Sequence, residues 1–221
     1  MKILVVGEPA RFSECRLKFP DHSLQHVESH TDADALIANC DVVFDFIIGK
    51  HPEHFHLYAT KRLAVFLNTA TITLASLVQS SAQAVQCTAF GFNGFPTFFN
   101  RELLEVCVWR NEDALQLEPL CKLLKTEFLI VDDRVGLVTP RVICMIINEA
   151  YYTVQEKTAS RNDIDLAMKL GTNYPYGPFE WCERIGLKNV YELLSALYDD
   201  TKDERYKISA LMKKEYMGIG Y

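Results

Sequence analysis

The pattern of apolar and polar positions divides the chain into two halves. In the first half, short runs of β-branched and aromatic residues alternate with stretches of helical spacing. The runs predict strands at residues 2–6, 23–28, 41–48, 63–67, 84–92, 103–109 and 128–131. The stretches predict helices at residues 32–37, 73–79 and 112–125. This alternation favours a shortened, Rossmann-like doubly wound α/β domain, which we bound at residues 1–132.

The second half, residues 133–221, has the pattern of an all-helical domain that follows a short linker at 132–134. Residues 138–152 predict a long helix with Pro140 in its first turn, where proline is tolerated. Because this helix is apolar on nearly every side, we expect it to be buried or to lie in a subunit interface. Further helices are predicted at 163–170, 179–185, 190–198 and 209–216.

Residues 163–187 carry the most distinctive local pattern of the chain. Ser160 and Asp163 form an S-x-x-D helix start. Gly171 stands where a helix commonly ends with a left-handed residue. The Tyr-Pro-Tyr-Gly-Pro sequence at 174–178 then imposes a rigid turn. We therefore predict a capped helix, a fixed turn and a second helix.

Composition and charge narrow the class of protein. A hydrophobic content of 49% is typical of a globular chain with an ordinary core. The net charge of -6 argues against nucleic acid as the main partner, because phosphate binding needs a basic face. No apolar run approaches the length of a membrane span. The seven cysteines form no CxxC pair and follow no secretory signal, which predicts free thiols in the cytoplasm.

The loop after the first predicted strand bears on cofactor binding. A dinucleotide site would need G-x-G-x-x-G here, so that backbone amides can approach a pyrophosphate. The chain has Gly7 followed by Glu8 and Pro9, which add a negative charge and remove an N–H donor. We expect this loop not to bind a dinucleotide in the usual way. Glu28 stands where an acidic residue would hold a ribose hydroxyl, but the broken glycine pattern favours a surface glutamate at a strand end.

A group of three histidines follows the third predicted strand. The spacing of His51, His54 and His56 could bring two of them near one metal ion. No pattern of cysteines or carboxylates accompanies them, so we predict a solvated loop or a helix start and no metal site.

The helical half resembles the C-terminal domain of the 3-hydroxyacyl-CoA dehydrogenase family. The resemblance lies in residues 134–150, 163–171, 174–180 and the Asp-Glu-Arg-Tyr-Lys stretch from Asp203. In that family this domain supplies dimer contacts and one wall of the acyl-CoA cleft. The resemblance therefore implies a homodimer through the C-terminal helices and an acyl-CoA thioester as ligand.

The first half resembles the same family over shorter segments. Residues 33–48 resemble the helix and strand ahead of the nicotinamide, which makes Asp45 a cofactor-binding candidate together with Gly7 and Glu28. Residues 103–106 resemble the strand that carries the catalytic glutamate. The family's cofactor is NAD. The segment before Asp41 is shorter than the family usually has, which implies that a helix pair and a strand are missing.

The resemblance also assigns the positions of the family's chemistry. In the family, a histidine takes the hydroxyl proton of a 3-hydroxyacyl-CoA while hydride passes to NAD, and a glutamate orients that histidine. Glu105 matches the glutamate. The histidine position falls on Asn93 when counted without gaps, or on Phe90 in a second alignment. No histidine follows His56, and the amide of asparagine cannot act as a general base.

The family's substrate-binding positions are altered as well. Residues 67–71 resemble its Asn-Thr-Ser-Ser turn, with Asn68 retained, Ala70 at the serine and Thr71 next as a substitute hydroxyl. Pro140 replaces a family asparagine in the first turn of the long helix.

Three hypotheses follow from these residues. We favour a divergent family member with impaired or lost NAD-dependent dehydrogenase activity, which still binds acyl-CoA or acts as an oligomeric partner. The alternative is an active NAD-dependent 3-hydroxyacyl-CoA (3-hydroxybutyryl-CoA) dehydrogenase of fatty acid metabolism. A third hypothesis is a helical dimerisation module with a decayed partner domain.

Overall fold

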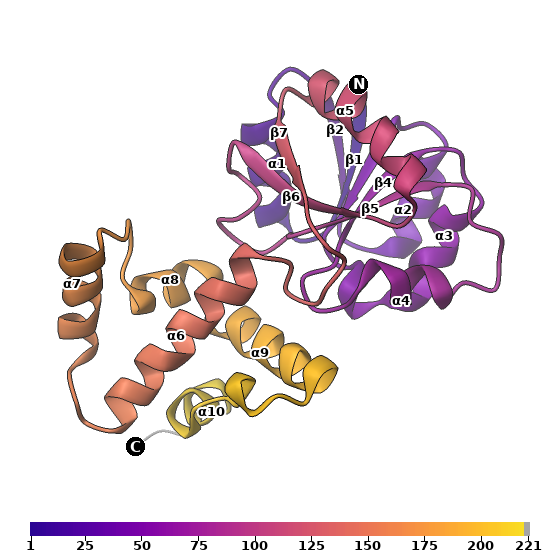
Figure 1. Ribbon diagram of the computed structural model, residues 1–221. Helices are drawn as coiled ribbons and strands as arrows, with labels where there is room; N and C mark the ends of the chain where they lie inside the picture. The colour runs from indigo at the N-terminus through magenta and orange to yellow at the C-terminus, as the bar shows by residue number, and fades with distance from the viewer. Residues whose placement is uncertain (219–221) are drawn as a thin grey trace. The chain divides into compact units, whose positions relative to one another are not determined.

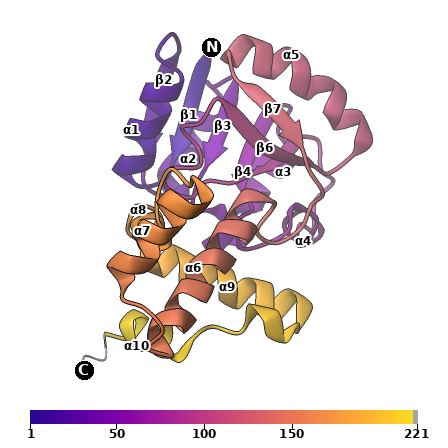
Figure 2. The same cartoon turned by 60° about the vertical axis from the view of Figure 1, so that its left-hand side comes forward.

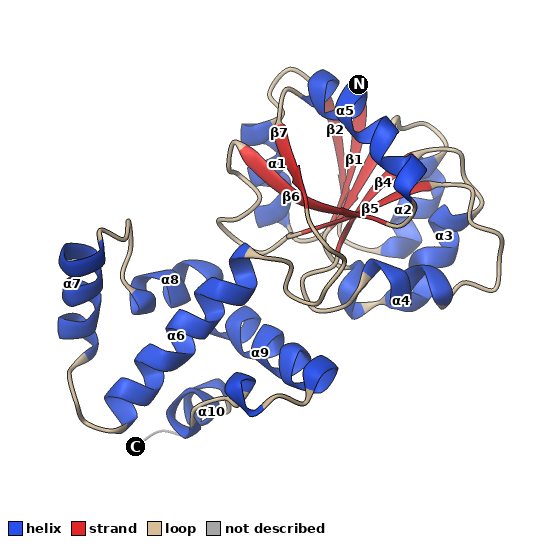
Figure 3. Cartoon of the chain, viewed as in Figure 1, coloured by secondary structure: helices blue, strands red, loops and turns tan. Residues whose placement is uncertain are grey.

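The computed structural model describes residues 1–218 and divides the chain into two compact units. The sheet unit comprises Met1–Gly94 and Phe98–Leu137, and the helical unit comprises Phe95–Thr97 and Val138–Tyr221. Figure 3 shows all the strands in the first unit and only helices in the second. Among residues 1–218, no helix combines the length and the apolar character needed to span a bilayer.

The sheet unit is built on one seven-stranded sheet in the order β2-β1-β3-β4-β5-β6-β7 (Figure 1). All neighbouring strands are parallel except β5 and β6, which are antiparallel. The strands are β1 (Lys2–Val6), β2 (Ser23–Val27), β3 (Val42–Asp45), β4 (Ala64–Asn68), β5 (Thr88–Phe92), β6 (Leu103–Val108) and β7 (Glu127–Ile130). This sheet confirms the predicted Rossmann-like fold class.

Helices cover both faces of the sheet, and alternate residues of each strand supply the two cores. Leu4, Val43 and Val65 pack against α2, α3 and α4 on one face. Ile3, Phe44 and Phe66 pack against α1 and α5 on the other, where Figure 2 shows α5 beside β6 and β7. The helices are α1 (Pro9–Lys18), α2 (His30–Ile37), α3 (His56–Ala59), α4 (Leu74–Gln79) and α5 (Ala114–Leu124).

Two strands are shorter than predicted, and one helix was not predicted. The strand expected at 41–48 ends at Asp45, because the Asp45 carboxylate accepts hydrogen bonds from the next two free amides and turns the chain into a 3-10 helix, Ile48–Lys50. The strand expected from residue 84 begins at Thr88. Helix α1 begins at Pro9, where the sequence pattern predicts only a loop.

The helical unit contains α6 (Thr139–Gln155), α7 (Arg161–Thr172), α8 (Pro178–Ile185), α9 (Leu187–Thr201) and α10 (Ala210–Tyr216). The predicted apolar helix is α6, and Pro140 lies buried in its first turn as expected. Only one stripe of α6 is buried, however, and Val142 on the opposite side is 53% exposed. Helix α7 packs on α8 and α6 but has no buried residue (Figure 1).

The predicted end of α7 at Gly171 is wrong. The helix continues through Gly171 to Thr172, and Asn173 adopts the left-handed conformation that ends it, with φ of 57°. Asparagine tolerates this conformation better than most residues. The predicted start is confirmed, because the Ser160 hydroxyl accepts a hydrogen bond from the Asp163 amide.

Candidate functional site

The candidate site lies at the carboxyl ends of the parallel strands. Strand β1 pairs with β2 on one side and β3 on the other, so the strand order reverses beside β1. Open α/β sheets bind ligands outside the carboxyl ends of their strands at such a point. Gly7 directly follows β1, and Asp45 and Asn68 are the last residues of β3 and β4. The fold thus brings these three predicted residues to one edge of the sheet.

The backbone of Gly7 is engaged within the protein. Its N–H donates to the Val27 carbonyl at 2.9 Å, and its carbonyl lies 2.8 Å from His26 Nε2. A Cβ atom added at Gly7 would stand 3.0 Å from the Cβ of Phe46, and φ is +153°. Only glycine therefore fits this close approach. Glu28 is exposed just after β2.

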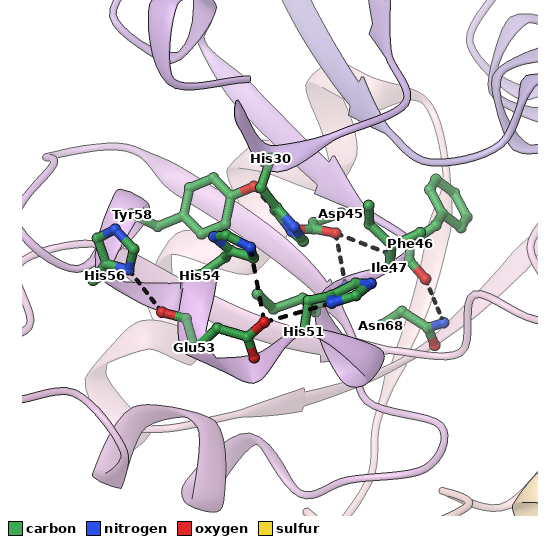
Figure 4. Close-up of polar contacts among 11 residues, drawn as sticks. His30, Asp45, Phe46, Ile47, His51, Glu53, His54, His56, Tyr58 and Asn68 are labelled. Atoms are coloured by element: carbon green, nitrogen blue, oxygen red, sulfur yellow. Dashed lines mark hydrogen bonds and ion pairs between the residues drawn. The ribbon is translucent and has the colours of Figure 1, made fainter. Parts of the chain in front are cut away.

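Asp45 is the centre of a buried polar network (Figure 4). Its Oδ1 accepts hydrogen bonds from the Ile47 and Ile48 amides, both at 2.9 Å. Its Oδ2 accepts from the Tyr58 hydroxyl at 2.9 Å and lies 2.7 Å from His30 Nε2. Asp45 has no exposed surface, and His30 is 3% exposed. All four partners of the carboxylate belong to the chain itself.

Sequence reasoning missed this network. His30 comes from α2, Asp45 from β3 and Tyr58 from α3, so no local spacing links them. Because the three residues are far apart in sequence and lie on different elements, they form no sequence motif. The one available signal is an aspartate that ends a fully buried strand, since a buried carboxylate needs hydrogen-bond donors.

Asn68 joins three strand ends. Its Nδ2 donates to the Phe46 carbonyl at 3.0 Å (Figure 4). Its Oδ1 accepts from the Gly94 amide at 3.0 Å and the Ala70 amide at 3.3 Å. A Cβ atom added at Gly94 would lie 2.7 Å from Asn68 Cγ. The carboxamide therefore holds the loops that follow β3, β4 and β5 close together.

The two residues that the resemblance assigns to the family's acid–base pair lie on β6 and directly after its neighbour β5. Phe92 pairs with Val106 in the antiparallel register of β5 and β6, so Asn93 and Glu105 are each one residue beyond that pair. This register suits the alignment that places the histidine position at Asn93. Phe90 pairs instead with Val108 and is fully buried. Asn93 is 6% exposed, and Glu105 is half-buried.

The predicted substrate-binding residues fall into both units. Ala70 is buried, and its carbonyl accepts a hydrogen bond from the Gly136 amide at 2.8 Å. Thr71 is half-buried in the same turn. Pro140 belongs to the helical unit, at the second position of α6. The structure therefore brings Ala70 and Thr71 together with Asn68, in one turn of the sheet unit.

The predicted histidine group lies at a helix start, as expected. His54 belongs to a 3-10 helix, Pro52–Phe55, and His56 begins α3. Within residues 1–218, no group of three or more histidine, cysteine, aspartate or glutamate side chains is arranged to hold a metal ion. The group includes a fourth ring that the spacing did not reveal, because His30 stacks on His54 with 4.4 Å between ring centroids.

The helical unit has a cavity of about 630 Å³ beside α6, α7 and α8. The Arg161 guanidinium lies over the rings of Tyr151 and Phe179, at 5.2 and 4.9 Å from their centroids, and pairs with Glu215. Burial raises the pKa of the Tyr151 hydroxyl, which donates to Glu215 at 2.9 Å. The charged groups on this side of the cavity are thus paired with one another.

Comparison with known proteins identifies relatives of both units. A model of the 3-hydroxyacyl-CoA dehydrogenase C-terminal domain matches residues 136–217. The 3-hydroxyadipyl-CoA dehydrogenase of Escherichia coli K12 is 41% identical over 86 residues, which are 39% of this chain and 18% of that protein. A probable 3-hydroxybutyryl-CoA dehydrogenase of Deinococcus radiodurans is 29% identical over 205 residues, which are 88% of this chain and 72% of that protein.

A solved structure shares the fold over nearly the whole chain. It is (S)-3-hydroxybutyryl-CoA dehydrogenase PaaH1 from Ralstonia eutropha, with a TM-score of 0.71, 19% identity, and coverage of 98% of this chain and 93% of that one. The sequence matches and the shared fold agree with the resemblance seen in residues 134–180. Residues 136–217 match the C-terminal domain of the 3-hydroxyacyl-CoA dehydrogenase family, and over most of its length the chain is similar to proteins named for that activity.

Proposed function

We propose that this chain is a family member that has lost NAD-dependent hydride transfer and binds an acyl-CoA thioester. The observation that carries the proposal is the Gly7 loop, whose backbone and surroundings do not fit the pyrophosphate of NAD. The Gly7 N–H is used by Val27, Pro9 has no N–H, and Phe46 lies against Gly7. A pyrophosphate site needs free amides and open space at this turn.

The pair Asn93 and Glu105 supports the same proposal. In the alignment that we favour, Asn93 stands where the family's reaction needs a histidine, and the register of β5 and β6 supports this alignment. A carboxamide does not accept a proton near neutral pH, and a missing general base typically costs about 10²–10⁴-fold in rate. The sequence has no histidine after His56 that Glu105 could orient from this strand. The buried Asp45 carboxylate serves the fold in this proposal and does not contact a cofactor.

Ligand binding and turnover test this proposal together. We expect no NADH consumption with acetoacetyl-CoA above background, no change of melting temperature with NAD, and a rise with acetoacetyl-CoA. NADH consumption that falls in Glu105→Ala would instead establish the active NAD-dependent dehydrogenase. If neither ligand raises the melting temperature, acyl-CoA binding is excluded and the dimerisation module remains.

Homodimerisation is the second proposed property, and α7 favours it. This helix has no buried residue, and its Leu166 and Leu170 are 54% and 78% exposed. Exposed apolar side chains at helical spacing are typical of an interface. The seven free cysteines support a reducing, cytoplasmic setting for such an assembly.

Light scattering after gel filtration tests the dimer. We expect a dimer at micromolar concentration and a shift toward monomer in Leu170→Glu. Leu123→Glu is the matched control, because Leu123 is 59% exposed on α5 of the sheet unit. A monomeric wild type, or equal dissociation by both variants, would exclude α7 as the interface.

A further inference from the structure

Four of the six histidines gather beside the carboxyl end of β3. The ring centroids of His30 and His54 are 4.4 Å apart, with the rings stacked at 25°. His51 lies 6.0 Å from His30 and 6.1 Å from His54, and His56 lies 6.1 Å from His54. Imidazole is the side chain that changes charge between pH 5 and 8. We call these four residues the histidine patch.

One ring of the stack is fixed and the other is on a short surface segment. His30 is buried, and its Nε2–H donates to the Asp45 carboxylate at 2.7 Å. Asp45 is itself held by the Ile47 and Ile48 amides and by Tyr58. The side chain of His54, by contrast, is 35% exposed on the 3-10 helix Pro52–Phe55. If the rings must separate, His54 and its segment are the part that can move.

The charges around His54 set the direction of its response. The titratable groups that face it are His30 from α2, and His51, Glu53 and His56 from its own segment. Burial and then the charge of His30 lower the pKa of His54. The Glu53 carboxylate, whose Oε1 lies 3.8 Å from His54 Nε2, raises the pKa of His54. The Glu53 side chain is 64% exposed, so solvent screens this attraction.

We propose that the stacked rings of His30 and His54 form an acid-sensitive latch, which releases residues 51–56 from the sheet unit when both rings are protonated. Two imidazolium rings stacked at 4.4 Å repel each other, and His30 cannot turn away without losing Asp45. Release of this segment separates the charges and leaves the Ile47, Ile48 and Tyr58 donors on Asp45. It also exposes Phe55, which is 1% exposed in the closed state.

The dependence on pH follows from the open and closed states. In the open segment the pKa of His54 returns to its ordinary value of about 6.5, while in the closed segment it is lower. The open state therefore binds the proton more tightly, and opening becomes favourable as the pH falls below about 6.5. Each unit of difference in pKa multiplies the ratio of open to closed molecules by about ten.

Hydrogen–deuterium exchange of the full chain, followed by mass spectrometry, tests the latch. Exchange is compared at pH 7.5 and 5.5 in buffer with EDTA, with labelling times scaled for the intrinsic rate. We expect amides of residues 51–56 to lose protection at pH 5.5, because the pKa of His54 is lowered in the closed state. Amides of β1, in the centre of the sheet unit, should keep their protection.

Two variants at neighbouring positions separate the latch from general acid sensitivity. His54→Phe keeps an aromatic ring on His30 but cannot gain a proton, so the acid response should disappear. His56→Phe removes an exposed ring at the edge of the patch and should keep the response. If His54→Phe fails to fold, His54→Gln removes the same proton site with a smaller side chain.

Three results would overturn the proposal. The first is equal protection of residues 51–56 at both pH values in the wild type. The second is the same acid response in His54→Phe, or His54→Gln, as in the wild type. The third is a loss of protection in β1 together with residues 51–56, because the acid transition would then be unfolding of the whole sheet unit.

Discussion

Two aspartates tie neighbouring segments together in different ways in the two units. Asp45 in the sheet unit is fully buried and accepts hydrogen bonds from two side chains and two backbone amides. Asp165 in the helical unit is half-buried on α7 and accepts from the Phe179 and Glu180 amides, at 2.8 and 3.1 Å. Asp165 thus caps the N-terminus of α8, where the helix dipole favours a carboxylate.

The difference teaches what each carboxylate contributes to stability. Water can replace part of what Asp165 provides, because its surroundings are partly exposed. Water cannot fully replace Asp45, since three of its four donors are buried and would be left without an acceptor. The hydrogen bonds of Asp45 should therefore dominate the stability of the region around it. The stability of the turn between α7 and α8 should depend more on how closely its residues pack.

Replacement of Asp45 by alanine should have the largest effect. We expect Asp45→Ala to lower the free energy of unfolding by about 3–5 kcal/mol, because it leaves a buried histidine, a hydroxyl and two amides unpaired. Urea denaturation followed by circular dichroism measures the loss. Tyr58→Phe removes one hydrogen bond only and should cost about 1 kcal/mol. Equal costs for the two variants would contradict the central role of Asp45.

Gly177→Ala should have an intermediate effect in the other region. A Cβ atom at Gly177 would overlap the Asp165 side chain, which must then move away from the amides that it caps. We expect a loss of about 1–3 kcal/mol, the usual cost of overpacking. Thermal unfolding of the variant measures it. An unchanged melting temperature would mean that the corner tolerates displacement of Asp165.

Gly171→Ala should have the smallest effect and the opposite sign. Gly171 lies within α7, and nothing stands within 4 Å of an added Cβ atom. Alanine in a helix is more stable than glycine by about 0.5–1 kcal/mol, so the melting temperature should rise slightly. Differential scanning calorimetry of Gly171→Ala beside Gly177→Ala gives a matched pair. A lower melting temperature for Gly171→Ala would show that another group contacts this position in solution.

The same contrast explains which parts of the structure the sequence reveals. The start of α7 and the turn before α8 are formed by residues close in sequence, so the spacing of Ser160 and Asp163 predicts the cap that the structure has. The strands of the sheet were predicted because buried parallel strands are short apolar runs. The fold class and the family resemblance could therefore be predicted from the sequence.

The candidate site could be predicted from the sequence only in part. The position of Asn93 relative to Glu105 depends on the register of β5 and β6, which the loop between them does not specify. The network around Asp45 joins three elements, and no pattern in a single sequence links His30 to Tyr58. The predicted helix end at Gly171 is wrong because either glycine or asparagine can end a helix, and here Asn173 does so two residues later.

The network at Asp45 has a further consequence for the order in which the sheet unit folds. Asp45 is separated from His30 by 15 positions and from Tyr58 by 13, so both contacts close short loops. Short loops form quickly and at low entropic cost. The network can therefore assemble before β5, β6 and β7 add to the sheet, and it gives β1, β2 and β3 a core of their own. Asp45→Ala should accordingly slow refolding more than it hastens unfolding, as expected for a residue in the folding nucleus.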